Sequence, residues 1–186
     1  ALCVMAAPGN SALLTAQIRP AAAVWYSAAS TVVTASQSGL HEYTWPQLQP
    51  LRQLECSIEH ILDLQLAADQ QRLLVAGGTP GEIGVLQLLD LHSGRTLLTC
   101  TPHSDRITQT CWLPGEQQIL TASDDGTSTV LDATDGTVQR RISLHSRPLL
   151  ALTFSSSLPA ATAGMDGIIR LWQPQDGQLI RTLDNH

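Results

Sequence analysis

The sequence contains no lysine, and this absence limits the kinds of ligand that the protein is expected to bind. All ten basic residues of the 186 are arginines, and the net charge at neutral pH is −6. A surface that follows the phosphates of a nucleic acid needs clustered cations, but only Arg140 and Arg141 are adjacent in this chain. We therefore expect no nucleic-acid partner.

Long apolar runs are missing as well. No stretch reaches the roughly 18 apolar residues that a membrane-spanning helix needs, so we expect no membrane span. Residues 1–12 pass from apolar to small and polar, which is typical of the end of a secretory signal peptide but also suits a strand. The localisation therefore stays open between cytoplasmic and exported.

Cysteine is scarce, and the four cysteines are far apart in the chain, at Cys3, Cys56, Cys100 and Cys111. None forms a Cys-x-x-Cys pair, so we expect neither a zinc site nor a thioredoxin-like site. We predict that they are small apolar core residues, with the disulfide state left open. Charged residues are also few, at 14%, and a composition rich in Leu, Val, Ile, Thr and Ser favours half-buried strands.

What the sequence does contain is an internal repeat with a period of 41 to 42 residues. Three columns of residues share this period: Gly84, Gly126 and Gly167; Gly94, Gly136 and Gly177; and His103, His145 and His186. A period of about 40–45 residues is typical of a four-stranded propeller blade. Within one unit the pattern of apolar runs and turns predicts four strands, at 107–113, 118–122, 127–131 and 137–142.

The repeat resembles that of the WD-repeat family, of the bacterial type. Trp172 stands where that family places the Trp of its Trp-Asp pair, and Asp90 and Asp132 stand at the Asp position. The resemblance implies an all-β fold, a β-propeller with about four four-stranded antiparallel WD-type blades. The predicted divisions are an N-terminal segment at 1–20, a degenerate blade 1 at 21–56, blade 2 at 57–101, blade 3 at 102–143 and blade 4 at 144–186.

Four such blades rarely close a ring, because the family usually has about seven. We therefore predict a partial, open propeller with apolar blade faces exposed at both ends. The full-length chain would then supply further blades.

The resemblance also implies a structural hydrogen-bond network in blades 3 and 4. Its members are His103, Thr121 and Asp125 in one blade, and His145, Thr162, Asp166 and Trp172 in the other. A catalytic relay of His, Asp and a hydroxyl is the alternative. Because a catalytic site occurs once and this trio recurs in each unit, we favour the structural interpretation and expect no catalytic residue.

Two segments depart from the repeat. His60 precedes its strand by fewer residues than His103 and His145 precede theirs, so we predict that His60 is displaced or exposed. The segment from Gly77 to Gly84 is about three residues longer than its counterparts, which predicts an extended turn. It lacks the Lys of a phosphate-binding loop, and no helix follows it. No cluster has metal-ligand spacing, and we expect neither a metal nor a cofactor.

These observations favour a non-catalytic scaffold that binds a protein or peptide through the loops of one propeller face. The candidate contacts are Thr79, Glu82, Asp105, Arg106, Asp124, Arg147 and Met165. The alternative is an accessory module of a larger bacterial enzyme or c-type haem redox protein. A propeller enzyme with a central-channel site is disfavoured, because the predicted inner strands carry no convergent acids.

Overall fold

The computed structural model describes residues 22–26, 30–36 and 38–184 of the chain. The N-terminal segment, predicted to be a strand or a signal remnant, and the repeat position His186 lie outside the described residues. The described residues form strands, turns and loops, with no helix among them.

The sixteen strands form four separate antiparallel sheets, each built from four consecutive strands. The first sheet contains β1 (Ala22–Tyr26), β2 (Thr31–Ser36), β3 (Gly39–Thr44) and β4 (Pro50–Leu54). The second contains β5 (Ile61–Leu66), β6 (Arg72–Thr79), β7 (Ile83–Asp90) and β8 (Thr96–His103). The third contains β9 (Ile107–Trp112), β10 (Gln118–Ser123), β11 (Ser128–Asp132) and β12 (Val138–Ile142). The fourth contains β13 (Leu149–Ser155), β14 (Leu158–Gly164), β15 (Ile169–Trp172) and β16 (Leu179–Leu183).

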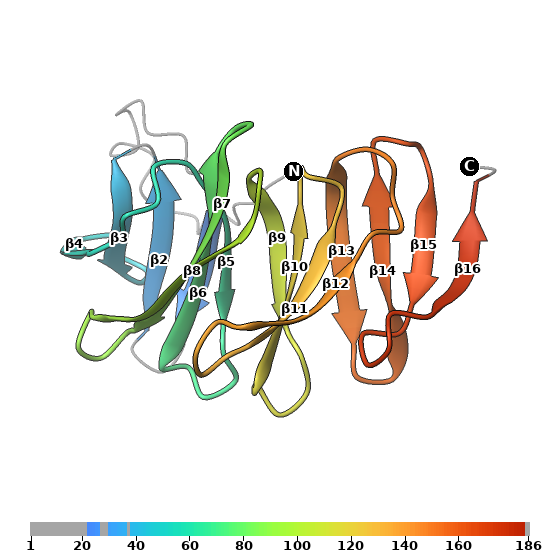
Figure 1. The fold of residues 1–186 in the computed structure, drawn as a ribbon. Coiled ribbons are helices and arrows are strands. Elements are labelled where there is room, and N and C mark those ends of the chain that lie inside the picture. Colours follow the sequence, from blue (N-terminus) through green and yellow to red (C-terminus); the bar gives the residue numbers. More distant parts are fainter. Residues whose placement is uncertain (1–21, 27–29, 37, 185–186) are drawn as a thin grey trace.

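The four sheets stand side by side in an open arc (Figure 1). The first strand of each sheet is the inner one, since β5 contacts β1 and β9, and β9 contacts β13. The fourth strands, β4, β8, β12 and β16, lie at the outer edges of their sheets. This arrangement confirms the predicted fold class, an open propeller of four-stranded blades, which we number 1 to 4 in chain order. Where one repeat unit ends and the next begins stays a prediction.

Each gap between neighbouring blades is filled by its own apolar cluster. Strand β6 shows how one strand serves two clusters, because successive side chains point to opposite faces. Leu73 and Val75 pack towards blade 1, whereas Leu74 and Ala76 pack towards blade 3. A blade covered on both faces therefore reads as a continuous apolar run rather than as an alternating one.

The prediction of an extended turn at 77–84 is wrong. Strands β6 and β7 continue as a paired hairpin beyond the ends of their counterparts, and only residues 80–82 form the turn. Glycine is needed within these strands because other backbone lies against them. A Cβ on Gly77 would lie 1.9 Å from the carbonyl oxygen of His60, and one on Gly84 would lie 2.2 Å from that of Asp105. His60 itself is exposed.

The trailing glycines of the repeat mark the contacts between blades. Gly136 has a φ of +73°, which favours glycine, and a Cβ there would lie 3.0 Å from the Cβ of Cys100 on the outer strand of the preceding blade. Gly94 and Gly177 have φ values of +71° and +77° and lie against outer strands β4 and β12 in the same way. We call the contact region between two neighbouring blades a seam. The trailing glycines therefore place one seam in every 41 to 42 residues.

Candidate protein-binding face

The chain of hydrogen bonds in blade 4 runs through four buried side chains. Trp172 Nε1 donates to Thr162 Oγ1 over 3.1 Å, and the Thr162 hydroxyl lies 2.9 Å from His145 Nε2. His145 Nδ1 lies 3.1 Å from Asp166 Oδ1. In the tautomer that fits all three contacts, Thr162 donates to Nε2 and the Nδ1–H donates to the carboxylate. The four residues that the resemblance to WD repeats implied as a network thus contact one another in sequence from Trp172 to Asp166.

Blade 3 makes a similar network without a tryptophan. His103 Nδ1 lies 2.9 Å from Asp125 Oδ2, and its Nε2 lies 2.7 Å from Thr121 Oγ1. Thr129 Oγ1 lies 2.6 Å from the Thr121 hydroxyl and so takes the place of the indole donor of blade 4. Leu131, which replaces the tryptophan, is buried in the apolar cluster instead.

Both aspartates of these networks are held as carboxylates. Burial alone would raise the pKa of Asp125, but hydrogen bonds from His103 and Thr127 outweigh it, and the pKa lies well below its usual range. The pKa of Asp166 is lowered in the same way, because hydrogen bonds from Arg170 and His145 outweigh the effect of burial. The pKa of His145 is lowered by burial and by the Arg170 charge, against the opposing effect of Asp166.

The geometry disfavours a catalytic relay at these histidines. The His103 side chain is fully buried, and 2% of the His145 side chain is exposed. In each imidazole ring both nitrogens have a hydrogen-bond partner. A general base must reach the proton that it removes. Neither ring reaches an external substrate while its network stays intact.

Thr79 is the last residue of β6, and the other candidate contact residues lie on the connections that follow β6, β8, β10, β12 and β14. These connections share one edge of the arc (Figure 1). Hydrogen bonds join these connections to one another. Asp105 Oδ1 accepts from the Gly81 amide over 2.8 Å, and Arg106 donates to Asp124 Oδ2 from Nε and Nη2, over 3.0 and 2.6 Å. The Met165 amide donates to the Pro148 carbonyl over 2.8 Å. The edge is therefore a braced rim rather than a set of independent loops.

Not all of the candidates are equally available to a partner. Glu82, Arg147 and Met165 are exposed, the last with 56% of its surface accessible. Thr79 and Asp105 are half-buried, together with Arg106 and Asp124, which form an ion pair. The first three therefore supply free side chains, while the others hold the rim in shape.

Sequence reasoning missed several residues that complete these networks. Thr127 lies in the turn before β11 and Thr129 lies on β11, at alternate positions after Asp125. Both side chains contact the blade 3 network. Arg170 donates to Asp166 Oδ2 over 2.7 Å, four residues along the chain. Their only sequence signal is this short spacing from the aspartate, since they differ between units and so form no repeat column.

The inner strands are also joined across blades. Asp63 Oδ2 accepts from the amide and hydroxyl of Thr110, over 2.7 and 2.8 Å, and Gln109 Oε1 accepts from the Leu152 amide over 2.5 Å. A side-chain acceptor of one blade thus satisfies a backbone donor of the next.

Three of the cysteines are described, and Cys56, Cys100 and Cys111 are half-buried free thiols. Burial raises the pKa of Cys100 to about 11 and that of Cys111 to about 12, so both stay protonated at neutral pH. Within the described ranges there is no cluster of three or more potential metal ligands. The same part of the chain has no helix long and apolar enough to cross a bilayer.

Comparison with known proteins supports the repeat assignment directly. Residues 94–131 and 136–173 match the family model described as "WD domain, G-beta repeat". These two segments are WD repeats. Each runs from the outer strand of one blade through the first three strands of the next, so each WD repeat bridges two blades.

A relative is found among curated proteins as well. The chain is 32% identical over 87 residues to the COMPASS component SWD3 of Saccharomyces cerevisiae. The match covers 46% of this chain and 27% of the yeast protein, so the chain spans about a quarter of the length of that relative. Because the relative is from yeast, the expectation of a bacterial type gains no support.

Proposed function

We propose that this protein is a non-catalytic WD-repeat scaffold that binds a protein or peptide partner through the braced rim of loops. The observation that carries the proposal is the set of hydrogen bonds that join Gly81 to Asp105 and Arg106 to Asp124. A rim that is already ordered loses little conformational entropy when a partner binds. The similarity to a component of a multi-subunit complex supports the same function.

The free side chains on this rim suggest what the partner presents. Glu82 and Arg147 carry opposite charges, and Met165 adds an exposed apolar side chain. Methionine adapts well to irregular apolar surfaces. A partner with an apolar anchor and a mixed-charge rim would match this surface. No feature of the geometry favours the alternative of an accessory module in a haem or redox enzyme.

Affinity capture with quantitative mass spectrometry tests this proposal. The wild-type chain is compared with a rim variant, Glu82→Arg with Arg147→Glu and Met165→Asp, whose net charge is lower by one. We expect the rim variant to lose at least about tenfold of the captured partner, since several contacts fail together.

A matched control carries Gln175→Asp at the opposite edge of the arc, where the residue is exposed and the net charge is likewise lower by one. This control is expected to keep the partner. If the rim variant and the control retain the same proteins in equal amounts, the assignment to the rim is wrong.

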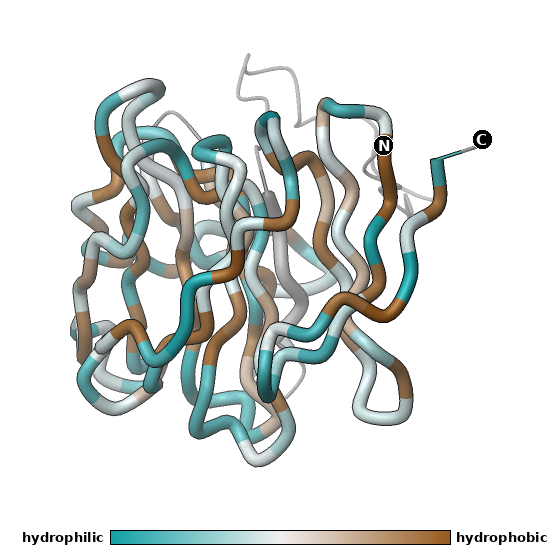
Figure 2. The backbone as a smooth tube through the Cα atoms, turned by 45° about the vertical axis from the view of Figure 1, so that its right-hand side comes forward, coloured by the Kyte–Doolittle hydropathy of each residue, from teal (hydrophilic) through white to brown (hydrophobic). Residues whose placement is uncertain are grey.

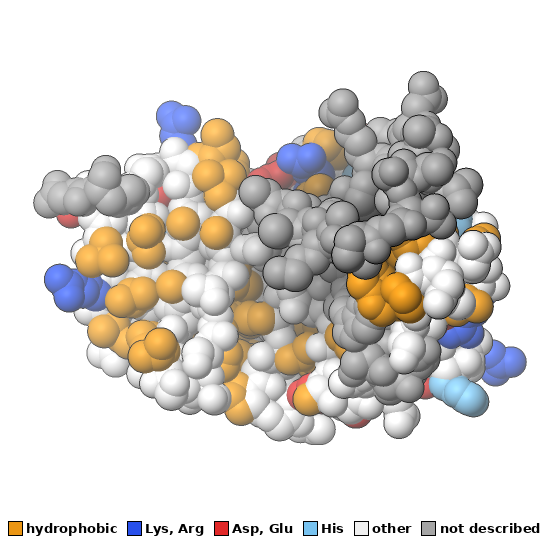
Figure 3. All heavy atoms as spheres, turned by 180° about the vertical axis from the view of Figure 1, so that it is seen from behind, with side chains coloured by type: hydrophobic (Ala, Val, Ile, Leu, Met, Phe, Trp, Pro, Cys, Tyr) orange, Lys and Arg blue, Asp and Glu red, His pale blue; other side chains and the backbone are white. Residues whose placement is uncertain are grey.

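We also propose that a further propeller blade packs on the free face of blade 4. The equivalent face of blade 3 buries Leu120, Ala122 and Val130 almost completely. The residues at the same register in blade 4 are Ala161, Ala163 and Leu171, which are only half-buried. Hydrophobic side chains gather on this end of the molecule, and hydrophobic segments alternate along its strands (Figures 2 and 3).

We expect the 186-residue chain to self-associate, because an uncovered apolar blade face binds other apolar surfaces. Light scattering coupled to size-exclusion chromatography should show dimers or larger species. The variant Leu171→Glu should shift the chain to monomer. A clean, compact monomer of the wild-type chain would contradict this proposal.

A further inference from the structure

The outer strands of three blades share a feature that blade 2 lacks. At one register position these strands carry an arginine: Arg52 on β4, Arg140 on β12 and Arg181 on β16. At the same register β8 carries Leu98, which pairs with Leu88 as Arg140 pairs with Val130. Blade 2 is therefore the exception in its outermost strand.

In two seams this arginine closes the gap to the next blade. Arg140 Nη1 donates to the Pro174 carbonyl of blade 4 over 2.9 Å. Arg52 donates to the equivalent carbonyl of blade 2, that of Leu91. The corresponding carbonyl of blade 3 belongs to Ala133, and the apolar Leu98 offers it no donor. Within the described residues, the Ala133 carbonyl accepts no hydrogen bond.

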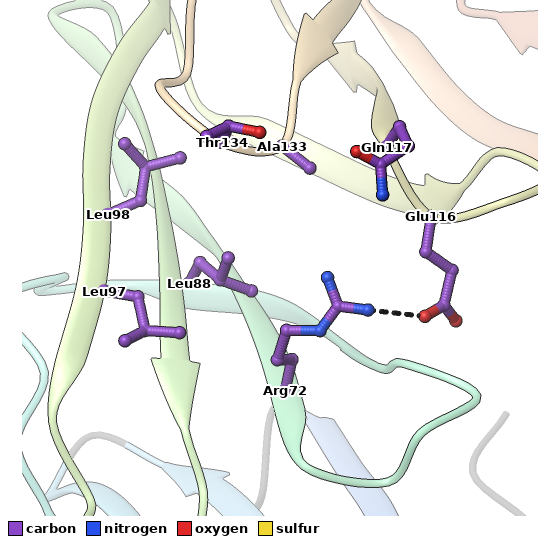
Figure 4. A pocket seen from close by; sticks show the side chains of 8 residues that line it. All are labelled: Arg72, Leu88, Leu97, Leu98, Glu116, Gln117, Ala133 and Thr134. Atoms are coloured by element: carbon purple, nitrogen blue, oxygen red, sulfur yellow. Dashed lines mark hydrogen bonds and ion pairs between the residues drawn. The ribbon is translucent and has the colours of Figure 1, made fainter.

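The seam between blades 2 and 3 is open at this place. A cavity of about 250 Å³ lies there, between the start of β6, strands β7 and β8, and the two turns that precede β10 and β12 (Figure 4). Leu88, Leu97 and Leu98 form its apolar wall, and Leu97 is 55% exposed. Aliphatic side chains that line a solvent-accessible cavity make favourable contacts with an apolar group of a ligand.

The polar wall of the cavity is held rigidly by Arg72. Its Nε donates to Asp69 over 2.6 Å, its Nη2 donates to Glu116 over 2.7 Å, and its guanidinium carbon lies 5.1 Å from the centre of the Trp112 ring. The remaining nitrogen, Nη1, faces the cavity (Figure 4). In the described part of the chain, Nη1 donates to no acceptor. The cavity thus offers one fixed donor beside one free carbonyl acceptor.

The edge strand beside the cavity is unprotected. Strand β8 is eight residues long, and its segment 96–101 contains neither a charge nor a proline. The other outer strands are five residues long and each carries an arginine. Edge strands that are long, uncharged and partly apolar are templates for pairing with another strand.

We propose that this seam is a docking site for an extended, uncharged peptide segment of a partner protein. The peptide adds as a strand to the free edge of β8 and inserts one aliphatic side chain against Leu88, Leu97 and Leu98. One of its carbonyls accepts from Arg72 Nη1, and one of its amides donates to the Ala133 carbonyl. A neutral backbone carbonyl suits the site better than a carboxylate, because Asp69 and Glu116 flank Arg72 with a net negative charge.

This site is separate from the rim of loops, which lies at the opposite edge of the arc (Figure 1). Peptide binding at the seam and partner binding at the rim can therefore be tested independently of each other.

The test uses fluorescein-labelled, capped heptapeptides of alternating Thr and Val, with Leu, Ile, Met, Gly or Asp at the centre, titrated onto the full chain. Fluorescence polarisation measures the affinity. We expect the peptides with an aliphatic centre to bind at least about tenfold more tightly than those with Gly or Asp. Amide NMR shifts should change in 96–101 and around Glu116 and Ala133.

The decisive variant is Leu98→Arg, which gives blade 2 the residue of the other outer strands. It should close the seam, leave the fold intact and weaken the aliphatic peptides at least about tenfold. The reciprocal variant Arg140→Leu should open a second seam and add a second binding site. Equal affinity of the wild-type and Leu98→Arg chains overturns the proposal, as does a lack of discrimination between Leu and Gly centres.

Pairing of β8 with a second copy of the chain is the competing outcome. In that case the Leu171→Glu chain would still form dimers, and adding Leu98→Arg to it would abolish them. The chain would bind none of the peptides. That result would also overturn the peptide proposal.

Discussion

At the scale of single residues, the hydroxyl of Thr162 is the point on which the blade 4 network depends. It accepts from Trp172 and contacts His145, so its loss leaves two buried nitrogens without a partner. The resemblance to WD repeats implied these partners, and His145 and Thr162 also have counterparts, His103 and Thr121, in the preceding unit. Neither the resemblance nor the repeat predicted Thr129 or Arg170, because the two blades fill the same need with different residues.

We expect Thr162→Val to lower the free energy of unfolding by about 3 kcal/mol, since a buried unsatisfied donor or acceptor costs about 1–3 kcal/mol. Thr162→Ser, which keeps the hydroxyl, should lose about 1 kcal/mol for its missing methyl group. Urea unfolding followed by tryptophan fluorescence measures both. Equal losses for the two variants would show that the hydroxyl contributes little.

The lowered pKa of His145 predicts a pH dependence of stability. Because the folded chain binds a proton at His145 less readily than the unfolded chain, the free energy of unfolding should fall as the pH drops below about 6.5. The pKa of Asp166 is lowered too, so its contribution is complete above about pH 4 and is lost only under more acidic conditions. An NMR titration of the His145 ring that gives a pKa at or above 6.5 would contradict this prediction.

At the scale of elements, the sequence predicted strands well and one hairpin poorly. The apolar runs of blade 3 gave bounds within about one residue of the observed ones, because turns with Gly and Asp separate them. The hairpin of β6 and β7 was misjudged because its glycines suggested a loop. Their actual reason is the close approach of backbone at His60 and Asp105, which only the three-dimensional packing reveals.

Two glycine substitutions should separate packing from backbone conformation. Gly84→Ala places a Cβ 2.2 Å from the Asp105 carbonyl oxygen, so blades 2 and 3 must shift, and we expect a loss of about 3 kcal/mol. Gly167→Ala meets open space at a φ of +73° and should lose only about 1 kcal/mol. Thermal and urea unfolding check the order of the two, and a reversed order would contradict the close approach at Gly84.

At the scale of the whole molecule, the main contacts between strands of different blades join neighbours along the arc. The number of blades followed from the repeat period, and their open arrangement was implied by the resemblance to a family that usually has about seven blades. The open seam between blades 2 and 3 did not, because it depends on which residue of an outer strand faces the next blade. That comparison requires the sheet registers, which no sequence column of glycine or histidine contains.

The open arc predicts that backbone amides are protected from hydrogen exchange to different degrees in different blades. Amide hydrogens of β6, β7, β10 and β11 should exchange most slowly, because these strands are covered on both faces. Those of β15 and β16, whose outer face is open, should exchange at least about tenfold faster. Hydrogen exchange with mass spectrometry measures this difference, and uniform protection across the four blades would contradict it.

The leucine at position 98 also has a genetic consequence. Most leucine codons become arginine codons through one change at the second base, and the reverse change is as simple. A single nucleotide therefore separates an arginine from a leucine at this position, while the fully buried side chains of the apolar cluster stay the same. Within a family of repeats, such grooves can arise and vanish at different seams, so that relatives with the same scaffold acquire different peptide partners.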